Sequence, residues 1–169
     1  ADNNTAVGNN CMVSNTTGTQ NTAVGSLALD ANTTANENTA VGYNAATANT
    51  TGTANTVMGH NSFDANTTGG SNVAIGAQSL GSNTTASDNT AIGAFSLRDN
   101  STGAGNTAAG RGALQHSTTS SNNTAVGFDA LNSNTTGTSN CAVGTNALRD
   151  NTDTNNNTAI GKDALKLNT

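Results

Sequence analysis

The sequence predicts an all-β fold, a parallel β-solenoid (β-roll) of ten turns with 17 residues in each turn. The first observation is a phrase, usually Asn-Thr-Ala-Val-Gly, that recurs ten times at intervals of 17 residues without an insertion or deletion. The second is that β-branched Thr and Val alternate with Ala within that phrase, as residues of a short strand do. The third is composition: aromatic residues make up 2% and charged residues 9% of the chain, so it cannot build a wide core.

The fixed spacing argues against disorder, although polar low-complexity sequences are often disordered. Ten turns stacked at the inter-strand spacing of ~4.8 Å give a rod roughly 48 Å long, in which each turn covers its neighbours. Residues 1–169 form one repeat domain, and because the chain begins and ends within a repeat we interpret it as a fragment of a longer chain. We number the repeat positions from 1 to 17, starting at the asparagine: Asn4, Asn21, Asn38, Asn55, Asn72, Asn89, Asn106, Asn123, Asn140 and Asn157.

Positions 2 to 4 form the predicted strand. Successive side chains of a strand point to opposite faces, and the Thr column accepts only the near-isosteric Val73 and the small Cys141 as replacements, so we expect Thr and Val to point inward and Ala outward. An outward column made almost entirely of Ala is hard to explain on a solvated face. The predicted core residues at position 4 are Val7, Val24, Val41, Met58, Ile75, Ile92, Val126, Val143 and Ile160.

Position 5 is Gly in every repeat, as a corner with positive φ or close backbone approach requires. Two variable residues follow on an exposed corner, and then a small residue and a large apolar one. We expect the large residue to point inward, where burial of each such side chain stabilises the fold by roughly 1.5–3 kcal/mol. The predicted core residues at position 9 are Leu29, Leu80, Leu97, Leu114, Leu131, Leu148 and Leu165.

The repeat ends in Asn-Thr-Thr-Gly, whose residue types favour turns and short strands. Stacked Asn side chains can bond to one another along the rod. The alternative is N-glycosylation, because these asparagines also begin acceptor sequences. The ladder is the simpler interpretation, since any Asn-Thr-Thr repeat creates the acceptor pattern. The residues concerned are Asn15, Asn32, Asn49, Asn66, Asn83, Asn100 and Asn134.

The stretch Asn72-Val73-Ala74-Ile75-Gly76-Ala77-Gln78-Ser79 resembles the head repeats of YadA-type trimeric autotransporter adhesins. The resemblance covers about half of each repeat and extends to repeats of phage fibres and other large surface proteins. It implies a left-handed roll, three identical chains side by side, and binding to host matrix or cells. The repeat is longer than the family's, by the Asn-Thr-Thr-Gly segment. If the trimer applies, the chain–chain interface is the position-3 column: Ala6, Ala23, Ala40, Val57, Ala74, Ala91, Ala108, Ala125, Ala142 and Ala159.

Several function classes find no support in the sequence. The net charge is −5, and every charged residue before Arg98 is acidic. The sequence has no stripe of basic residues that could bind nucleic acid. There is no apolar run long enough for a membrane span. Cys11 and Cys141 lie several turns apart, too far for a disulfide, and no catalytic motif, cofactor motif or metal-ligand pattern is present.

The leading hypothesis is therefore a non-catalytic structural and adhesive rod, extracellular or on a cell or virion surface. We expect it to assemble with itself as a homotrimer or fibre, and to meet a host surface or matrix. One alternative is an ice-binding solenoid that uses ranks of Thr and Asn, and another is a virion tail-fibre shaft. The candidate recognition residues occupy the variable corners: Tyr43, His60, Phe95, Arg111, Phe128 and Lys162.

Overall fold

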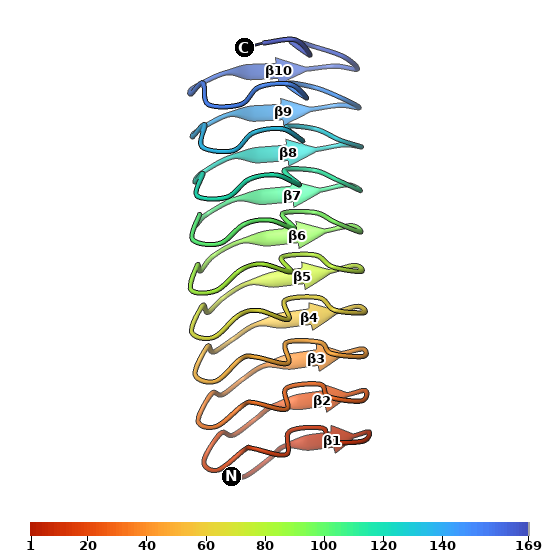
Figure 1. Ribbon diagram of the computed structural model, residues 1–169, viewed down its shortest axis with the longest axis vertical. Coiled ribbons are helices and arrows are strands. Elements are labelled where there is room, and N and C mark those ends of the chain that lie inside the picture. Colours follow the sequence, from red (N-terminus) through yellow and green to blue (C-terminus); the bar gives the residue numbers. More distant parts are fainter. Residues whose placement is uncertain (169) are drawn as a thin grey trace.

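The computed structural model describes residues 1–168, which form ten turns with one short strand in each turn (Figure 1). Every strand covers positions 2 to 4 of its repeat. The strands are β1 (Thr5–Val7), β2 (Thr22–Val24), β3 (Thr39–Val41), β4 (Thr56–Met58), β5 (Val73–Ile75), β6 (Thr90–Ile92), β7 (Thr107–Ala109), β8 (Thr124–Val126), β9 (Cys141–Val143) and β10 (Thr158–Ile160).

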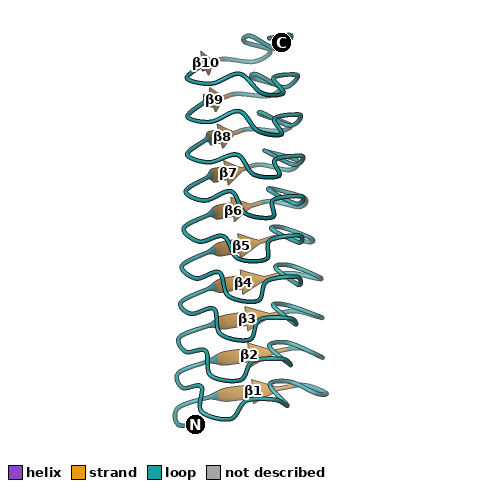
Figure 2. Cartoon of the chain, turned by 60° about the vertical axis from the view of Figure 1, so that its left-hand side comes forward, coloured by secondary structure: helices purple, strands orange, loops and turns teal. Residues whose placement is uncertain are grey.

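The strands form one parallel sheet in chain order, along one side of the rod (Figure 2). Each residue pairs with the residue 17 positions away, as Ala74 pairs with Ala91. Backbone hydrogen bonds also join neighbouring turns outside the sheet, for example from Leu80 N to Ser96 O at 3.0 Å. The predicted parallel β-solenoid with 17 residues per turn is confirmed, and no helix occurs in residues 1–168.

The orientation predicted for the strand is reversed in the structure. Ala91 is fully buried, whereas Ile92, the next residue, is 43% exposed. The position-4 residues therefore do not form the core. Val7, Val24, Met58, Ile92, Val126 and Ile160 are exposed, and Val41, Ile75 and Val143 are half-buried.

The position-3 residues belong to the interior instead of to a chain–chain interface. Ala23, Ala40, Val57, Ala74, Ala91, Ala108, Ala125, Ala142 and Ala159 are buried, while Ala6 is exposed in the first turn. They pack in one cluster with the large side chains of position 9 and the small ones of position 8. The interior is narrow, and the large position-9 side chains fill most of it, so a methyl group is what fits beneath the strand.

The predicted position-9 core is confirmed, because Leu29, Leu80, Leu97, Leu114, Leu131 and Leu148 are completely buried. Leu165 is the exception at 52% exposed, since it lies in the last turn and has a neighbouring turn on one side only. These leucines adopt positive φ values, such as 48° at Leu97, which bends the backbone so that the side chain points inward.

The position-5 glycines also match the prediction, with φ between 125° and 145° in all ten turns. A Cβ atom on Gly93 would lie 2.7 Å from the carbonyl carbon and oxygen of Gly110 in the next turn. Glycine is therefore needed at this corner for its conformation and for the close approach of adjacent backbones.

Two ladders of asparagine side chains run inside the rod. In the first, at position 1, Oδ1 of Asn55 accepts the backbone N–H of Asn72 at 2.9 Å, and Nδ2 of Asn72 donates to the Ala86 carbonyl at 3.0 Å. In the second, at position 12, Nδ2 of Asn66 donates to Oδ1 of Asn49 at 2.8 Å and to the Gly69 carbonyl at 3.1 Å. Buried amides and backbone groups are thus satisfied by equivalent groups one turn away.

The position-12 ladder is interrupted in the seventh turn, where Ser117 replaces Asn. Its hydroxyl pairs with Ser120, and Oδ1 of Asn100 is left buried without a partner. On the other side of the gap, Nδ2 of Asn134 keeps only its bond to the Gly137 carbonyl. One serine therefore removes two contacts between turns.

We predict that Ser117→Asn restores the ladder and raises the free energy of unfolding by about 1–2 kcal/mol, because it pairs a buried acceptor. The ninth turn shows that Asn at position 12 is compatible with a hydroxyl residue at position 15, since Asn151 and Thr154 are hydrogen-bonded there. Urea denaturation monitored by circular dichroism measures the change. Asn83→Ser, which creates the same gap in another turn, is the matched control and should lower the free energy of unfolding. The ladder is contradicted if neither variant, or if both variants, stabilise the protein.

Candidate functional site

The outer face of the sheet carries two rows of side chains, a Thr-rich row at position 2 and a Val- and Ile-rich row at position 4. Because adjacent strands are in register, each row repeats at about 4.8 Å, and the two rows lie roughly 7 Å apart. We call this surface the Thr/Val face. Away from the end turns it consists of Thr22, Val24, Thr39, Val41, Thr56, Met58, Val73, Ile75, Thr90, Ile92, Thr107, Ala109, Thr124, Val126, Cys141 and Val143.

The position-4 row of the Thr/Val face is apolar, and neither row of the face carries a charge. Val24, Met58 and Val126 are 37%, 48% and 38% exposed, and they lie in different turns of one continuous row. No Asp, Glu, Lys or Arg occupies position 2 or position 4 in any repeat. A long, contiguous apolar surface on an otherwise polar protein is typical of an interaction site.

The predicted corner residues lie at positions 6 and 7, just after the strand, and they interact along the rod. The rings of Tyr43 and His60 are stacked, with centroids 5.5 Å apart and an interplanar angle of 18°. The guanidinium carbon of Arg111 lies 5.6 Å from the ring centroids of both Phe95 and Phe128. The turn spacing thus brings side chains of consecutive repeats together into short aromatic columns.

The last predicted corner residue, Lys162, is exposed and has its Nζ atom 4.0 Å from Oδ2 of Asp163. It shares no contact with the aromatic columns in the described part of the chain. The six corner residues therefore occupy one edge of the rod but do not form a single site.

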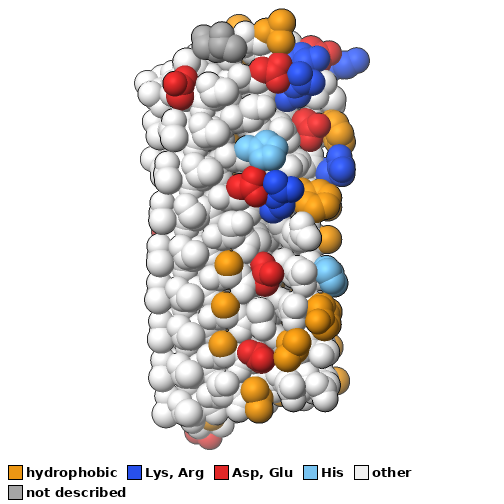
Figure 3. Space-filling model, viewed as in Figure 1, with side chains coloured by type: hydrophobic (Ala, Val, Ile, Leu, Met, Phe, Trp, Pro, Cys, Tyr) orange, Lys and Arg blue, Asp and Glu red, His pale blue; other side chains and the backbone are white. Residues whose placement is uncertain are grey.

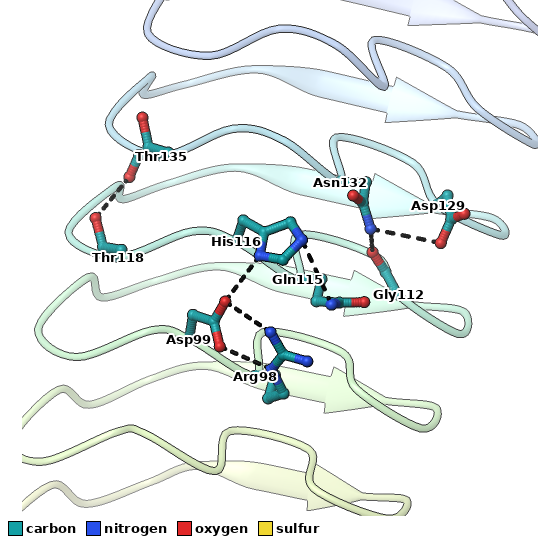
Figure 4. A network of polar contacts seen from close by, with 9 residues as sticks. All are labelled: Arg98, Asp99, Gly112, Gln115, His116, Thr118, Asp129, Asn132 and Thr135. Carbon is teal, nitrogen blue, oxygen red and sulfur yellow. Dashed lines mark hydrogen bonds and ion pairs between the residues drawn. The ribbon is translucent and has the colours of Figure 1, made fainter.

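Most charged side chains gather on one side of the rod, and the opposite strip in the same view carries few (Figure 3). In the middle of the charged side, Nε and Nη2 of Arg98 donate to Asp99 at 2.7 and 3.0 Å, and Nδ1 of His116 lies 2.8 Å from Oδ2 of Asp99 (Figure 4). The hydrogen bonds from the guanidinium lower the pKa of the Asp99 carboxyl. All three side chains are about one-third exposed or more, so the cluster adds little to stability.

The strip opposite the charged side contains the Asn-Thr-Thr segments, with Asp153 in place of the second Thr in the ninth turn. Position-13 hydroxyls donate to the next turn, as Thr50 Oγ1 does to the Thr67 carbonyl at 3.0 Å. Position 14 adds an exposed row of threonines: Thr17, Thr34, Thr51, Thr68, Thr85, Thr102, Thr119 and Thr136. The rod therefore has two Thr rows on different faces, one on the sheet and one on this strip.

The Asn-Thr-Thr asparagines confirm the ladder interpretation. Six of them, Asn32, Asn49, Asn66, Asn83, Asn100 and Asn134, are at most 1% exposed, and their amide nitrogens donate hydrogen bonds inside the rod. Asn15 is half-buried in the first turn, and its amide also donates inward. Glycosylation at these nitrogens would require the folded turns to open.

Cys11 and Cys141 are both free thiols, as the spacing predicts. Cys141 lies in the Thr row of the Thr/Val face, whereas Cys11 is at the inward-facing position 8, where burial raises its pKa. No group of three His, Cys, Asp or Glu residues able to hold a metal ion is found in residues 1–168. Over the same range, no helix is long and apolar enough to cross a membrane.

Comparisons with protein families, with curated proteins and with solved structures found no match to this chain. The functional conclusion therefore depends on the surface itself. Sequence reasoning missed the Thr/Val face, although one signal was available: a column restricted to Ala is typical of a tight interior, and its neighbours must then point outward.

Proposed function

We propose that this chain is a segment of a structural and adhesive rod, outside the cell or on a cell surface, that assembles with copies of itself. The observation that carries the proposal is the continuous, charge-free Thr/Val face. In keeping with the resemblance to adhesin head repeats, we propose a homotrimer of left-handed rolls. The proposed role is non-catalytic.

Copies of this chain fit the Thr/Val face better than an unrelated partner. Each row repeats at about 4.8 Å, and a second copy presents the same spacing along the same length. Two or three parallel copies can therefore interdigitate Val, Ile and Met side chains over all turns. An unrelated globular surface would match the spacing over a few turns only. Burial of exposed apolar side chains supplies the free energy of association.

The charged side lies away from the Thr/Val face, and the corners lie on the edge of the rod beside that face, so both stay available in such an assembly. The aromatic columns of Tyr43 with His60, and of Phe95, Arg111 and Phe128, offer the side-chain types that are enriched where proteins bind partners. In this proposal the sheet joins the copies, and the corners contact a host surface or matrix.

Assembly is tested by measuring mass in solution. We expect a species near three times 16.6 kDa by sedimentation equilibrium. Ile92→Asp should dissociate it, because a carboxylate in the middle of the Thr/Val face would be buried without a partner. Thr85→Asp places the same charge on the exposed position-14 row and should leave the mass unchanged. A wild-type monomer, or equal effects of the two variants, would contradict the proposed interface.

Ice binding is the second candidate, and the orientation of the Thr row favours it. The sequence suggested that the position-2 threonines are internal, but the structure places them on the outer surface, where Thr56 and Thr107 are exposed. Because the parallel strands are in register, their hydroxyl and methyl groups recur at a regular spacing along the sheet. The neighbouring Val row makes this lattice more apolar than the position-14 Thr row.

Thermal hysteresis separates the two candidates. The adhesive-rod proposal predicts that the chain at millimolar concentration does not depress the freezing point below the melting point. Ice binding requires a measurable gap that Thr90→Tyr, a bulky change on the Thr/Val face, abolishes. Thr85→Tyr, the same change in the exposed position-14 row, is the control. A gap lost only in the Thr90 variant, from a monomeric chain, would replace the leading proposal.

A further inference from the structure

A notch interrupts the charged side of the rod in the fifth turn, where position 10 is Gly81. Every other repeat has a side chain at this position. The notch has a volume of about 230 Å³ and is lined by Asn61, Asp64, Gln78, Gly81, Ser82 and Arg98. A Cβ atom on Gly81 would lie 3.4 Å from the Gln78 carbonyl oxygen, 3.5 Å from Oδ1 of Asp64 and 3.9 Å from Cγ of Arg98. These are ordinary van der Waals distances, so a side chain would fit at this position and would occupy the notch.

The side chains around the notch have unused hydrogen-bonding capacity. Oδ1 of Asn61 is buried without a partner. Asp64 forms no ion pair within the described residues, and burial raises the pKa of its carboxyl. Arg98 uses Nε and Nη2 on Asp99, which leaves Nη1 free. The Asp64 carboxylate and Nη1 of Arg98 are therefore available to a ligand in the notch, whereas Oδ1 of Asn61 is too deeply buried to be reached.

Polar side chains of these columns are paired in another part of the rod, although Oδ1 of Asn44, one turn before Asn61, is also buried without a partner. Three turns further along the rod, Nδ2 of Asn132 donates to the Gly112 carbonyl at 2.9 Å and lies 3.4 Å from Oδ1 of Asp129 (Figure 4). Polar side chains of the same columns are thus paired with one another there. Around Gly81, Asp64 and Arg98 lie one turn to either side of the glycine, and no side chain of their column stands between them.

The charges on the two walls restrict the class of ligand. The Asp64 carboxylate repels an anion, and the Arg98 guanidinium repels a cation, so neither kind of ion is favoured. A neutral molecule with several hydroxyl groups can donate to Asp64 and accept from Arg98. The volume of the notch lies below the roughly 300–1,000 Å³ of sites for drug-sized ligands. The occupant is therefore limited to a small molecule of about one ring.

We propose that the notch around Gly81 binds one neutral sugar ring. Asp64 accepts from its hydroxyl groups, Arg98 Nη1 donates to them, and Asn61, Gln78 and Ser82 complete the rim. The exposed stack of Tyr43 and His60 starts beside Asn61 and offers an apolar surface to a neighbouring unit of the same glycan. The biological meaning rests on the proposed adhesive function, because a glycan is then the class of partner recognised; the binding itself does not depend on assembly.

The inference is tested with the whole chain and a panel of methyl glycosides of glucose, galactose, mannose and N-acetylglucosamine, by saturation-transfer NMR. At least one glycoside should bind with roughly millimolar affinity. Gly81→Asn should weaken binding at least tenfold, because its side chain fills the notch. Asn is the native residue of this column in the eighth turn, so the variant should fold, which circular dichroism checks. Asp64→Asn should weaken binding about tenfold through loss of a charged acceptor.

Asp30→Asn is the matched control, since Asp30 occupies the same column two turns from Asp64 and lies outside the notch. It should leave the affinity unchanged. The inference is overturned if no glycoside binds, if binding survives Gly81→Asn, or if glucuronate, glucosamine or calcium ions bind more tightly than the neutral rings. If the chain forms trimers but binds no sugar, only the notch proposal is rejected. If a monomeric chain binds sugar, only the proposed assembly is rejected.

Discussion

Hydrogen bonds from the first asparagine of each repeat hold the turns of this rod in register. The Oδ1 atom accepts a backbone N–H from the equivalent asparagine of the next turn, and the amide nitrogen spans the interior to a position-15 carbonyl, as Asn89 does to Gly103 at 2.9 Å. Both partners are backbone groups that would otherwise be buried and unpaired. A repeat longer or shorter by one residue would break both contacts, which explains why no insertion interrupts the chain.

Register has a direct consequence for the surface. When each turn repeats the one before it, a side chain that points outward once points outward ten times. The position-4 row is therefore a continuous apolar line instead of scattered hydrophobic residues, and charged side chains collect on a different side of the rod. A solenoid thus turns a property of one repeat into a property of a whole face. A residue that departs from its column, such as Gly81 or Ser117, then changes the structure locally, while the other turns keep the common arrangement.

The fold could be predicted from the sequence, because period, turn length and strand position follow from the spacing of the asparagines. The buried column represented by Leu97 and the glycine corner represented by Gly93 were also predictable. The orientation of the strand was not, since Thr-Ala-Val alternates equally well with either face inward. We assigned the larger apolar residue to the interior, but the interior is narrow and Leu already fills it, so Ala91 points inward and Ile92 outward. The notch was out of reach because it depends on side chains from three turns.

The central proposal is that the Thr/Val face, which lies on the outside of each roll, is covered by equivalent turns of other copies. A short thiol-specific crosslinker tests it directly, because Cys141 is on that face and Cys11 is not. Parallel copies in register should give a covalent product between two Cys141 residues, unaffected by Cys11→Ser and identified by mass spectrometry of the linked peptides. A product formed through Cys11, or no product at concentrations where the chain is assembled, would contradict the account.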